Sequence, residues 1–159
     1  MSLDGRELRN ALGRFATGVT IITAMTEDQK AMGMTANSFS SVSLDPPLVL
    51  WSPARASKRC QAFEAADHFA IHILDERQQS YCKVFATEGG NFSELDWRLS
   101  DENVPLIQGC LARFECARHA VHDGGDHAII VGRVMAASYK DGNPLVFSAG
   151  SFGQFARAK

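Results

Sequence analysis

The sequence contains 159 residues, which is the size of one domain and is long enough to bury a core. Its hydrophobic content of 45% and charged content of 21% are typical of globular proteins, and a net charge of −2 excludes a broad basic surface for nucleic acid. The longest apolar runs, such as residues 128–131, are far too short to span a bilayer, and the first residues lack the apolar core of a signal peptide. We therefore expect one domain over residues 1–159, located in the cytoplasm, with no nucleic-acid or membrane partner.

The first part of the chain predicts a helix, three strands and a second helix. Residues 4–16 have the apolar spacing of an amphipathic helix, and the β-branched run at 18–25 predicts a strand. A polar turn then leads into a second strand near 31–39. The sequence "DPP" interrupts the chain before an apolar strand at 48–52. Residues 56–66 predict a short helix, because their apolar side chains recur every three positions.

The middle of the chain predicts one strand, one helix and one long loop. Residues 68–74 alternate between apolar and polar side chains, as in a strand, and residues 76–86 predict a helix. Residues 87–106 are polar and contain glycine, so we expect a loop. A structureless loop of this length usually has a function, for example as a lid.

The last part of the chain predicts two strands, near 111–122 and 127–139, joined by the tight turn "DGGD", and a final short strand "PLVFSAG". The total is about six or seven strands and three helices. Because the strands do not alternate with helices, a doubly wound parallel sheet is excluded, and an antiparallel barrel with helices packed outside is favoured. The glycine-rich dinucleotide fingerprint and the phosphate loop ending in Gly-Lys-Ser/Thr are both missing from the sequence.

The cysteines and histidines do not predict a metal site. The four cysteines are Cys60, Cys82, Cys110 and Cys116. They form no C-x-x-C pair, and without a secretion signal they predict reduced thiols. Cys116, His119 and His122 are spaced three apart, but odd steps along a predicted strand point to opposite faces of a sheet and cannot converge on one ion.

A dense row of small polar side chains separates two predicted strands. The row consists of Thr35, Asn37, Ser38, Ser40, Ser41 and Ser43. If these side chains point into a barrel they need hydrogen-bond partners, because an unpaired buried polar group costs roughly 1–3 kcal/mol. A ligand with many donors and acceptors would supply such partners. A solvated, serine-rich turn would explain the same composition, and the residues alone leave both interpretations open.

Over nearly its whole length the chain resembles the flavin reductase family of split-barrel flavin-binding proteins. Five segments carry the resemblance: "FATGVTIIT" (15–23), "GMTANSFSSVSLDPPLVLW" (33–51), "FAIHIL" (69–74), "GDHAIIVGRV" (125–134) and "PLVFSAGSF" (144–152). The resemblance implies a mainly β fold, namely an antiparallel six-stranded split β-barrel of Greek-key type with flanking α-helices. It also implies a homodimer with the flavin near the subunit boundary.

The resemblance further implies which residues bind the flavin. Residues 35–39 match the family's flavin-contacting segment, with Ser41 and Val42 just beyond it, and residues 85–92 match a segment that lies beside the flavin. Between them, residues 52–59 lie at the start of a predicted helix, where backbone N–H groups and basic side chains suit a phosphate. The implied cofactor-binding residues are Thr35, Ala36, Asn37, Ser38, Phe39, Ser41, Val42, Ser52, Ser57, Lys58, Arg59, Phe85, Ala86, Gly150 and Phe152. From the residues alone, the basic cluster could equally be a solvated helix start, and Phe85 could be ordinary core.

By the same resemblance, His127 positions the nicotinamide and Phe152 helps to cover the site. A lone histidine at this place can also be purely structural. Many relatives have tyrosine where this chain has Phe152, which removes any role for a hydroxyl at that position.

The function implied is that of an NAD(P)H:flavin oxidoreductase, which transfers hydride from C4 of the nicotinamide to N5 of FMN or FAD. Such a reaction needs two rings held in contact and no protein nucleophile. The expected partner is a flavin-dependent monooxygenase that receives the reduced flavin. Two alternatives remain open: a reductase with tightly bound FMN that acts on another acceptor, such as a cobalt corrinoid, and a non-enzymatic flavin-binding module. The choices between FMN and FAD and between NADH and NADPH are open as well.

Overall fold

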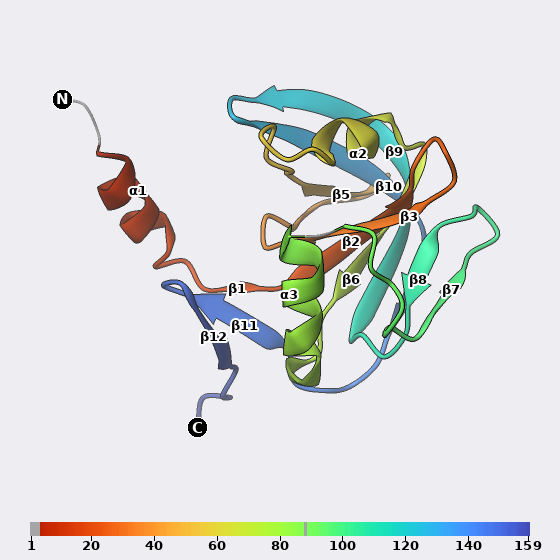
Figure 1. Cartoon of the computed structure of the whole chain (residues 1–159). Helices are drawn as coiled ribbons and strands as arrows, with labels where there is room; N and C mark the ends of the chain where they lie inside the picture. The colour runs from red at the N-terminus through yellow and green to blue at the C-terminus, as the bar shows by residue number, and fades with distance from the viewer. Residues whose placement is uncertain (1–3, 88) are drawn as a thin grey trace.

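The computed structural model describes residues 4–87 and 89–159, and its centre is a curved antiparallel sheet (Figure 1). This main sheet has seven strands in the order β3-β2-β6-β9-β10-β5-β4. Their bounds are Thr20–Met25 (β2), Ala31–Ala36 (β3), Ser40–Leu44 (β4), Pro47–Trp51 (β5), His68–Ile73 (β6), Ala112–Gly124 (β9) and His127–Tyr139 (β10). All of its pairings are antiparallel, which confirms the prediction of an antiparallel β-fold.

Two smaller sheets are separate from the main one. The first contains β1 (Thr17–Gly18), β11 (Leu145–Ser148) and β12 (Ser151–Gln154), and the second contains β7 (Trp97–Leu99) and β8 (Pro105–Ile107). The prediction of a loop over 87–106 was therefore wrong in part, because this segment contains β7 and β8. Both strands have only three residues, too few to show the alternation by which strands are recognised in sequence. Glu88, at the start of this segment, lies outside the described residues.

The three predicted helices are present, with shorter bounds. They are α1 (Gly5–Leu12), α2 (Cys60–Ala65) and α3 (Gln79–Thr87), and the short 3₁₀-helix η1 (Glu76–Gln78) leads into α3. The side chain of Asp4 caps α1 by accepting a hydrogen bond from the backbone N–H of Arg6 at 3.0 Å. Among the described residues, no helix combines the length and apolarity needed to cross a bilayer.

Strand β2 is buried on both faces, which explains why its sequence shows no alternation. Ile22 belongs to a core cluster with Trp51 and Phe69, inside the curved sheet. The neighbouring residue Ile21 points to the other face and packs in a second cluster that includes Phe85 of α3. Helix α3 thus covers one face of β2 and β3, and the two clusters fix the end of β3 against α3.

Helix α1 lies apart from the rest of the chain (Figure 1). None of its residues is buried, and Leu8, Leu12 and Phe15 are 42%, 65% and 80% exposed. The chain returns to the body where Gly13 accepts a hydrogen bond of 2.8 Å from the backbone N–H of Ala149, in the turn between β11 and β12. The amphipathic face that the sequence predicts therefore has no partner within the described chain.

Candidate functional site

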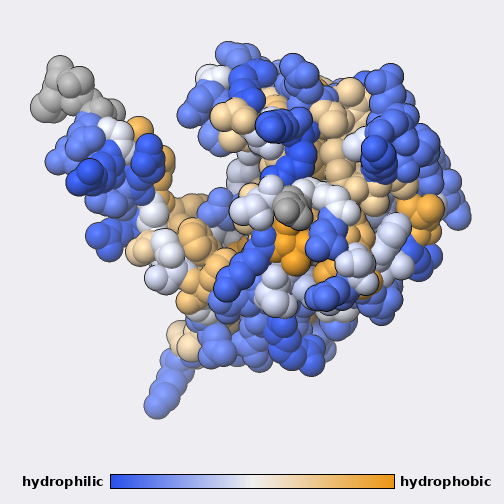
Figure 2. Space-filling model, in the orientation of Figure 1, coloured by the Kyte–Doolittle hydropathy of each residue, from blue (hydrophilic) through white to orange (hydrophobic). Residues whose placement is uncertain are grey.

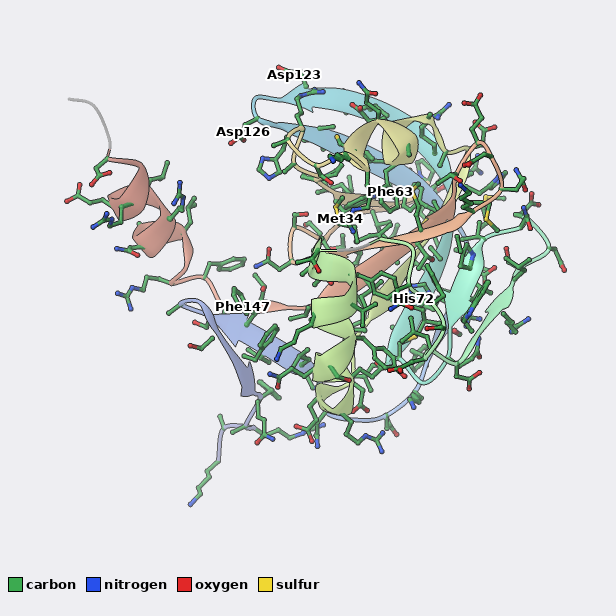
Figure 3. The ribbon with its side chains drawn as sticks, viewed as in Figure 1. Met34, Phe63, His72, Asp123, Asp126 and Phe147 are labelled. Carbon is green, nitrogen blue, oxygen red and sulfur yellow. The ribbon has the colours of Figure 1, made fainter. Side chains whose placement is uncertain are left out.

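A cavity of about 310 Å³ lies where the end of β3 meets α3 and the hairpin of β11 and β12. Its wall is mainly apolar, with a few polar groups, as is usual for cofactor sites. The lining residues are Val19, Thr35, Ala36, Asn37, Cys82, Lys83, Ala86, Phe147 and Phe152. In Figure 3, Phe147 projects from β11 on the side that faces α3. Five of the predicted flavin-binding residues, from three distant parts of the sequence, are thus brought together: Thr35, Ala36, Asn37, Ala86 and Phe152.

Two threonine hydroxyls hold the end of β3 in place beside this cavity. Thr35 donates a hydrogen bond of 2.9 Å to the carbonyl of Cys82, and this bond links β3 to α3. Thr20 of β2 donates one of 2.6 Å to the carbonyl of Ala36. With the backbone fixed on both sides, the next residue, Asn37, projects from a defined position. Its amide has no hydrogen-bond partner in residues 4–87 and 89–159.

Ser38 and Ser52 form a second fixed point, on the other side of Asn37. The Ser38 hydroxyl accepts a hydrogen bond of 2.9 Å from the backbone N–H of Ser52 and donates one of 3.2 Å to the Ser52 carbonyl. Phe39 packs against the core, with its ring stacked on Phe114 at a centroid distance of 5.6 Å. None of these three predicted residues belongs to the lining of the cavity.

The rest of the polar row forms a strand that the sequence did not reveal. Ser40, Ser41 and Ser43 belong to β4, which pairs with β5, so this part of the row is a paired strand and not a turn. The register shifts between Ser41 and Ser43, so Val42 occupies a bulge and is 50% exposed. Ser41 is exposed as well, and neither residue reaches the cavity of this chain.

Arg59 and Phe85 have structural positions that the sequence did not reveal, and neither residue lines the cavity. The Nη1 atom of Arg59 donates hydrogen bonds to the carbonyls of Gly33 at 2.7 Å and Phe85 at 2.9 Å, and so joins β3 to the last turn of α3. Burial lowers the pKa of Arg59. The Phe85 side chain is fully buried and packs on Gly33, where an added Cβ would lie 2.6 Å from the ring. Its ring belongs to the core and is not open to a ligand.

The predicted phosphate site at the start of the second helix lies outside the cavity wall. Helix α2 begins at Cys60, and Ser57 lies in the preceding turn, where its hydroxyl accepts a hydrogen bond of 3.2 Å from the backbone N–H of Arg59. The side chain of Arg55 is held by Glu64 and Asp123. Lys58 is exposed and remains available to a phosphate, away from the cavity.

Gly150 acts through the backbone of the hairpin that carries Phe152. Ala149 and Gly150 have φ values of +49° and +80°, and they form the two-residue turn between β11 and β12. Such turns need left-handed residues, which glycine adopts without steric cost. The turn places Phe152 opposite Phe147, and the two rings meet edge to face at 5.2 Å. Together these rings form one apolar wall of the cavity.

His127 lies at the base of the β9–β10 hairpin tip and does not line the cavity. Its Nδ1 is 2.7 Å from an Oδ1 atom of Asp126, and this hydrogen bond lowers the pKa of Asp126. In Figure 3, Asp126 lies well away from Phe147. The imidazole side chain is 44% exposed, so its Nε2 can face a bound molecule that extends beyond the cavity.

The residues present fit a flavin ring. Aromatic and alanine side chains form walls suited to a flat apolar ring, and the unpaired amide of Asn37 offers a donor and an acceptor to a polar ring edge. Sequence reasoning missed Cys82, Lys83 and the two wall residues Val19 and Phe147. Cys82 and Ala86 are four residues apart and share one face of α3, a pattern that can be recognised once the helix is assigned.

Comparisons with known proteins identify the family of this chain. The model of the family described as "Flavin reductase like domain" matches residues 12–156. The chain is 57% identical to the FMN reductase (NADH) SmoA of Agrobacterium fabrum, over 97% of this chain and 88% of that protein. It is 39% identical to the flavin-dependent monooxygenase reductase subunit HsaB of Rhodococcus jostii, over 95% of this chain and 78% of that protein.

A solved structure with the same fold is the Streptomyces globisporus NADH:FAD oxidoreductase SgcE6 in complex with NAD and FAD fragments. It superimposes with a TM-score of 0.90 at 38% identity, over 98% of this chain and 97% of that one. This likeness confirms the predicted split-barrel fold. The chain therefore belongs to the flavin reductase like domain family.

Proposed function

We propose that this flavin reductase uses NADH to reduce FMN or FAD in the cavity between β3, α3 and the β11–β12 hairpin. Relatives named as an FMN reductase (NADH) and an NADH:FAD oxidoreductase support this reaction, and they confirm the sequence-based prediction of activity and cofactors. Other relatives are reductase subunits of flavin-dependent monooxygenases, which supports a separate oxygenase as the acceptor of the reduced flavin. Four free thiols and a need for NADH support the cytoplasm as the location.

The observation that carries the proposal is the convergence at one cavity. Segments around residues 36, 86 and 152 are each predicted from the sequence to contact flavin, and all three line the same 310 Å³ space. When flavin is bound, its N5 atom accepts the hydride. The chain has to hold the two rings in contact and keep water away from them, and aromatic and alanine walls serve that purpose. Asn37 would orient the polar edge of the ring.

A substitution that fills the cavity tests this assignment. Ala86 is exposed on α3 and lines the cavity, so Ala86→Phe adds a ring to the space that the flavin needs. We expect the Kd for FMN and for FAD, measured by fluorescence quenching, to rise by about tenfold or more. A matched control is Ala65→Phe, since Ala65 is also exposed and helical but lines a different, polar cavity. Unchanged flavin affinity in a folded Ala86→Phe variant would refute the assignment.

We also propose that the protein is a homodimer in which a second copy covers α1. Figure 2 shows apolar surface along the side of α1 that faces the rest of the molecule. A helix of eight residues is unstable in water unless its apolar face is packed, and Leu12 and Phe15 are mostly exposed in the single chain. A second copy would bury both, with the same surface used on each subunit.

The oligomeric state tests the role of this helix. Leu12→Asp places a charge on the apolar face, whereas Asn10→Asp places the same charge on the opposite face of the same helix. We expect light scattering to give twice the 17.3 kDa chain mass for the wild type and for Asn10→Asp, and a shift toward the monomer for Leu12→Asp. A monomeric wild type at the concentrations used for turnover would refute the dimer.

A further inference from the structure

Among residues 4–87 and 89–159, Lys83 is the one formally charged residue that lines the cavity. It lies on α3, three residues before Ala86 and next to Cys82, so its stem leaves the helix on the side of the cavity. The side chain is exposed, and no carboxylate of residues 4–87 or 89–159 pairs with its ammonium group within 4.0 Å. The sequence motifs that predict flavin binding do not include it.

The other cations near the predicted site are engaged or lie elsewhere. Arg59 is bound to two backbone carbonyls, and Arg55 is paired with two carboxylates. Lys58 is exposed but is not part of the cavity wall. Lys83 is therefore the positive charge best placed to act on a ring held inside the cavity.

Hydride transfer gives this charge a chemical task. NADH delivers two electrons and one proton to N5, NADH becomes NAD⁺, and the flavin ring gains one negative charge, which is delocalised over N1 and the C2 carbonyl oxygen. A cation close to that edge stabilises the reduced form more than the neutral oxidised form. Because Lys83 is exposed, water screens its charge until a ring bound beside Phe147 and Phe152 excludes that water and lowers the local dielectric constant.

We propose that Lys83 binds the reduced, anionic flavin selectively and so favours hydride transfer toward the flavin. This inference rests on the proposed flavin cavity and deepens it, since it names the group that distinguishes the product from the substrate. Its consequence is that reduced flavin is held more tightly, relative to oxidised flavin, than it would be without the lysine. Release to a separate oxygenase would then be slower than it would be without the lysine.

The test compares the two redox states of one ligand. We would measure the Kd of FMN by fluorescence quenching, and that of FMN reduced with dithionite by anaerobic titration, for Lys83→Met and Lys83→Arg. We expect Lys83→Met to raise the Kd of reduced FMN by about tenfold while that of oxidised FMN changes by less than about threefold. A tenfold selective loss corresponds to a decrease of about 30 mV in the two-electron potential of bound flavin. Lys83→Arg should restore most of the difference, and Lys140→Met, which removes a lysine outside the cavity wall, should have no effect.

The outcomes separate this inference from the proposed function. If Lys83→Met weakens both redox states equally, or neither, the inference is wrong even when Ala86→Phe abolishes binding. If Ala86→Phe leaves binding intact, the cavity assignment is wrong, and the inference about Lys83 is overturned with it.

Discussion

The stability of the fold should depend on pH through His72, a fully buried residue of β6. Its Nδ1 lies 2.9 Å from the carbonyl oxygen of Ile21 in β2, and its Nε2 accepts a hydrogen bond of 3.0 Å from the backbone N–H of Ile107 in β8. The ring must donate from Nδ1 and accept at Nε2, so only the neutral form satisfies both partners. A proton on Nε2 would break the hydrogen bond to β8 and place a charge in the core. The His72 side chain is labelled in Figure 3.

The size of the effect follows from the pKa. Burial lowers the pKa of His72 from 6.5 to about 4. In the unfolded chain the histidine takes up a proton below pH 6.5, whereas the folded protein resists protonation until about pH 4, so the free energy of unfolding falls as pH decreases between these values. A difference of about 2.5 pKa units corresponds to roughly 3 kcal/mol, a large part of the total stability of a small domain. Below pH 4 this contribution no longer changes.

Urea unfolding of the flavin-free protein at pH 7.0, 5.5 and 4.5 measures the effect. His72→Gln removes the titrating group but keeps a donor and an acceptor, so we expect lower stability at pH 7 and a much flatter dependence on pH. His122→Gln, at an exposed position of β9, should retain the wild-type slope. If His72→Gln shows the same slope as the wild type, the pH dependence arises elsewhere and the reasoning is wrong.

Two further predictions concern turnover. His127→Ala should raise the KM for NADH or slow hydride transfer. It should change the Kd for FMN little, because His127 lies outside the cavity. If stopped-flow measurements give a normal rate of flavin reduction at all NADH concentrations, His127 has only a structural role. Burial raises the pKa of Cys82 to about 11 and that of Cys116 to about 12, and the pKa values of Cys60 and Cys110 are raised too. All four thiols should therefore be protonated at pH 7. Variants with serine or alanine in place of the cysteines should still reduce flavin if they fold. Loss of the hydride-transfer step in a folded variant would indicate a thiol mechanism.

Most of the main sheet could be predicted from the sequence, because its central strands are rich in β-branched and apolar residues. Strands β7 and β8 could not, since three residues give no periodic signal, and their pairing depends on contacts with distant parts of the chain. Strand β4 was hidden for another reason. Its residues are polar and mostly exposed, so nothing in their pattern distinguishes a paired strand from a solvated turn.

The candidate site was predictable to a similar extent. Motif resemblance identified Asn37, Ala86 and Phe152, which do meet at one cavity. The position of Lys83 in the cavity wall could not be predicted in this way, because it depends on which face of α3 the β11–β12 hairpin covers. The position of Arg59 could not be predicted either. Its hydrogen bonds to the carbonyls of Gly33 and Phe85, each 26 residues away, form only in the folded chain.

The polar row between β3 and β5 divides into two physical roles. Thr35 uses its hydroxyl on a backbone carbonyl of α3, and Ser38 uses its hydroxyl on the backbone of Ser52, just after β5, so each is already satisfied without a ligand. Asn37 lies between them and is the member whose side chain lines the cavity without a partner in the described chain. Loss of either hydroxyl should thus lower stability first and affinity second, because it frees a backbone group on which the position of Asn37 depends. Removal of the Asn37 amide should do the reverse, since the fold makes no use of it. Two hydroxyls of this segment thus hold the backbone on either side of Asn37, whereas Ser40, Ser41 and Ser43 belong to the mostly exposed strand β4.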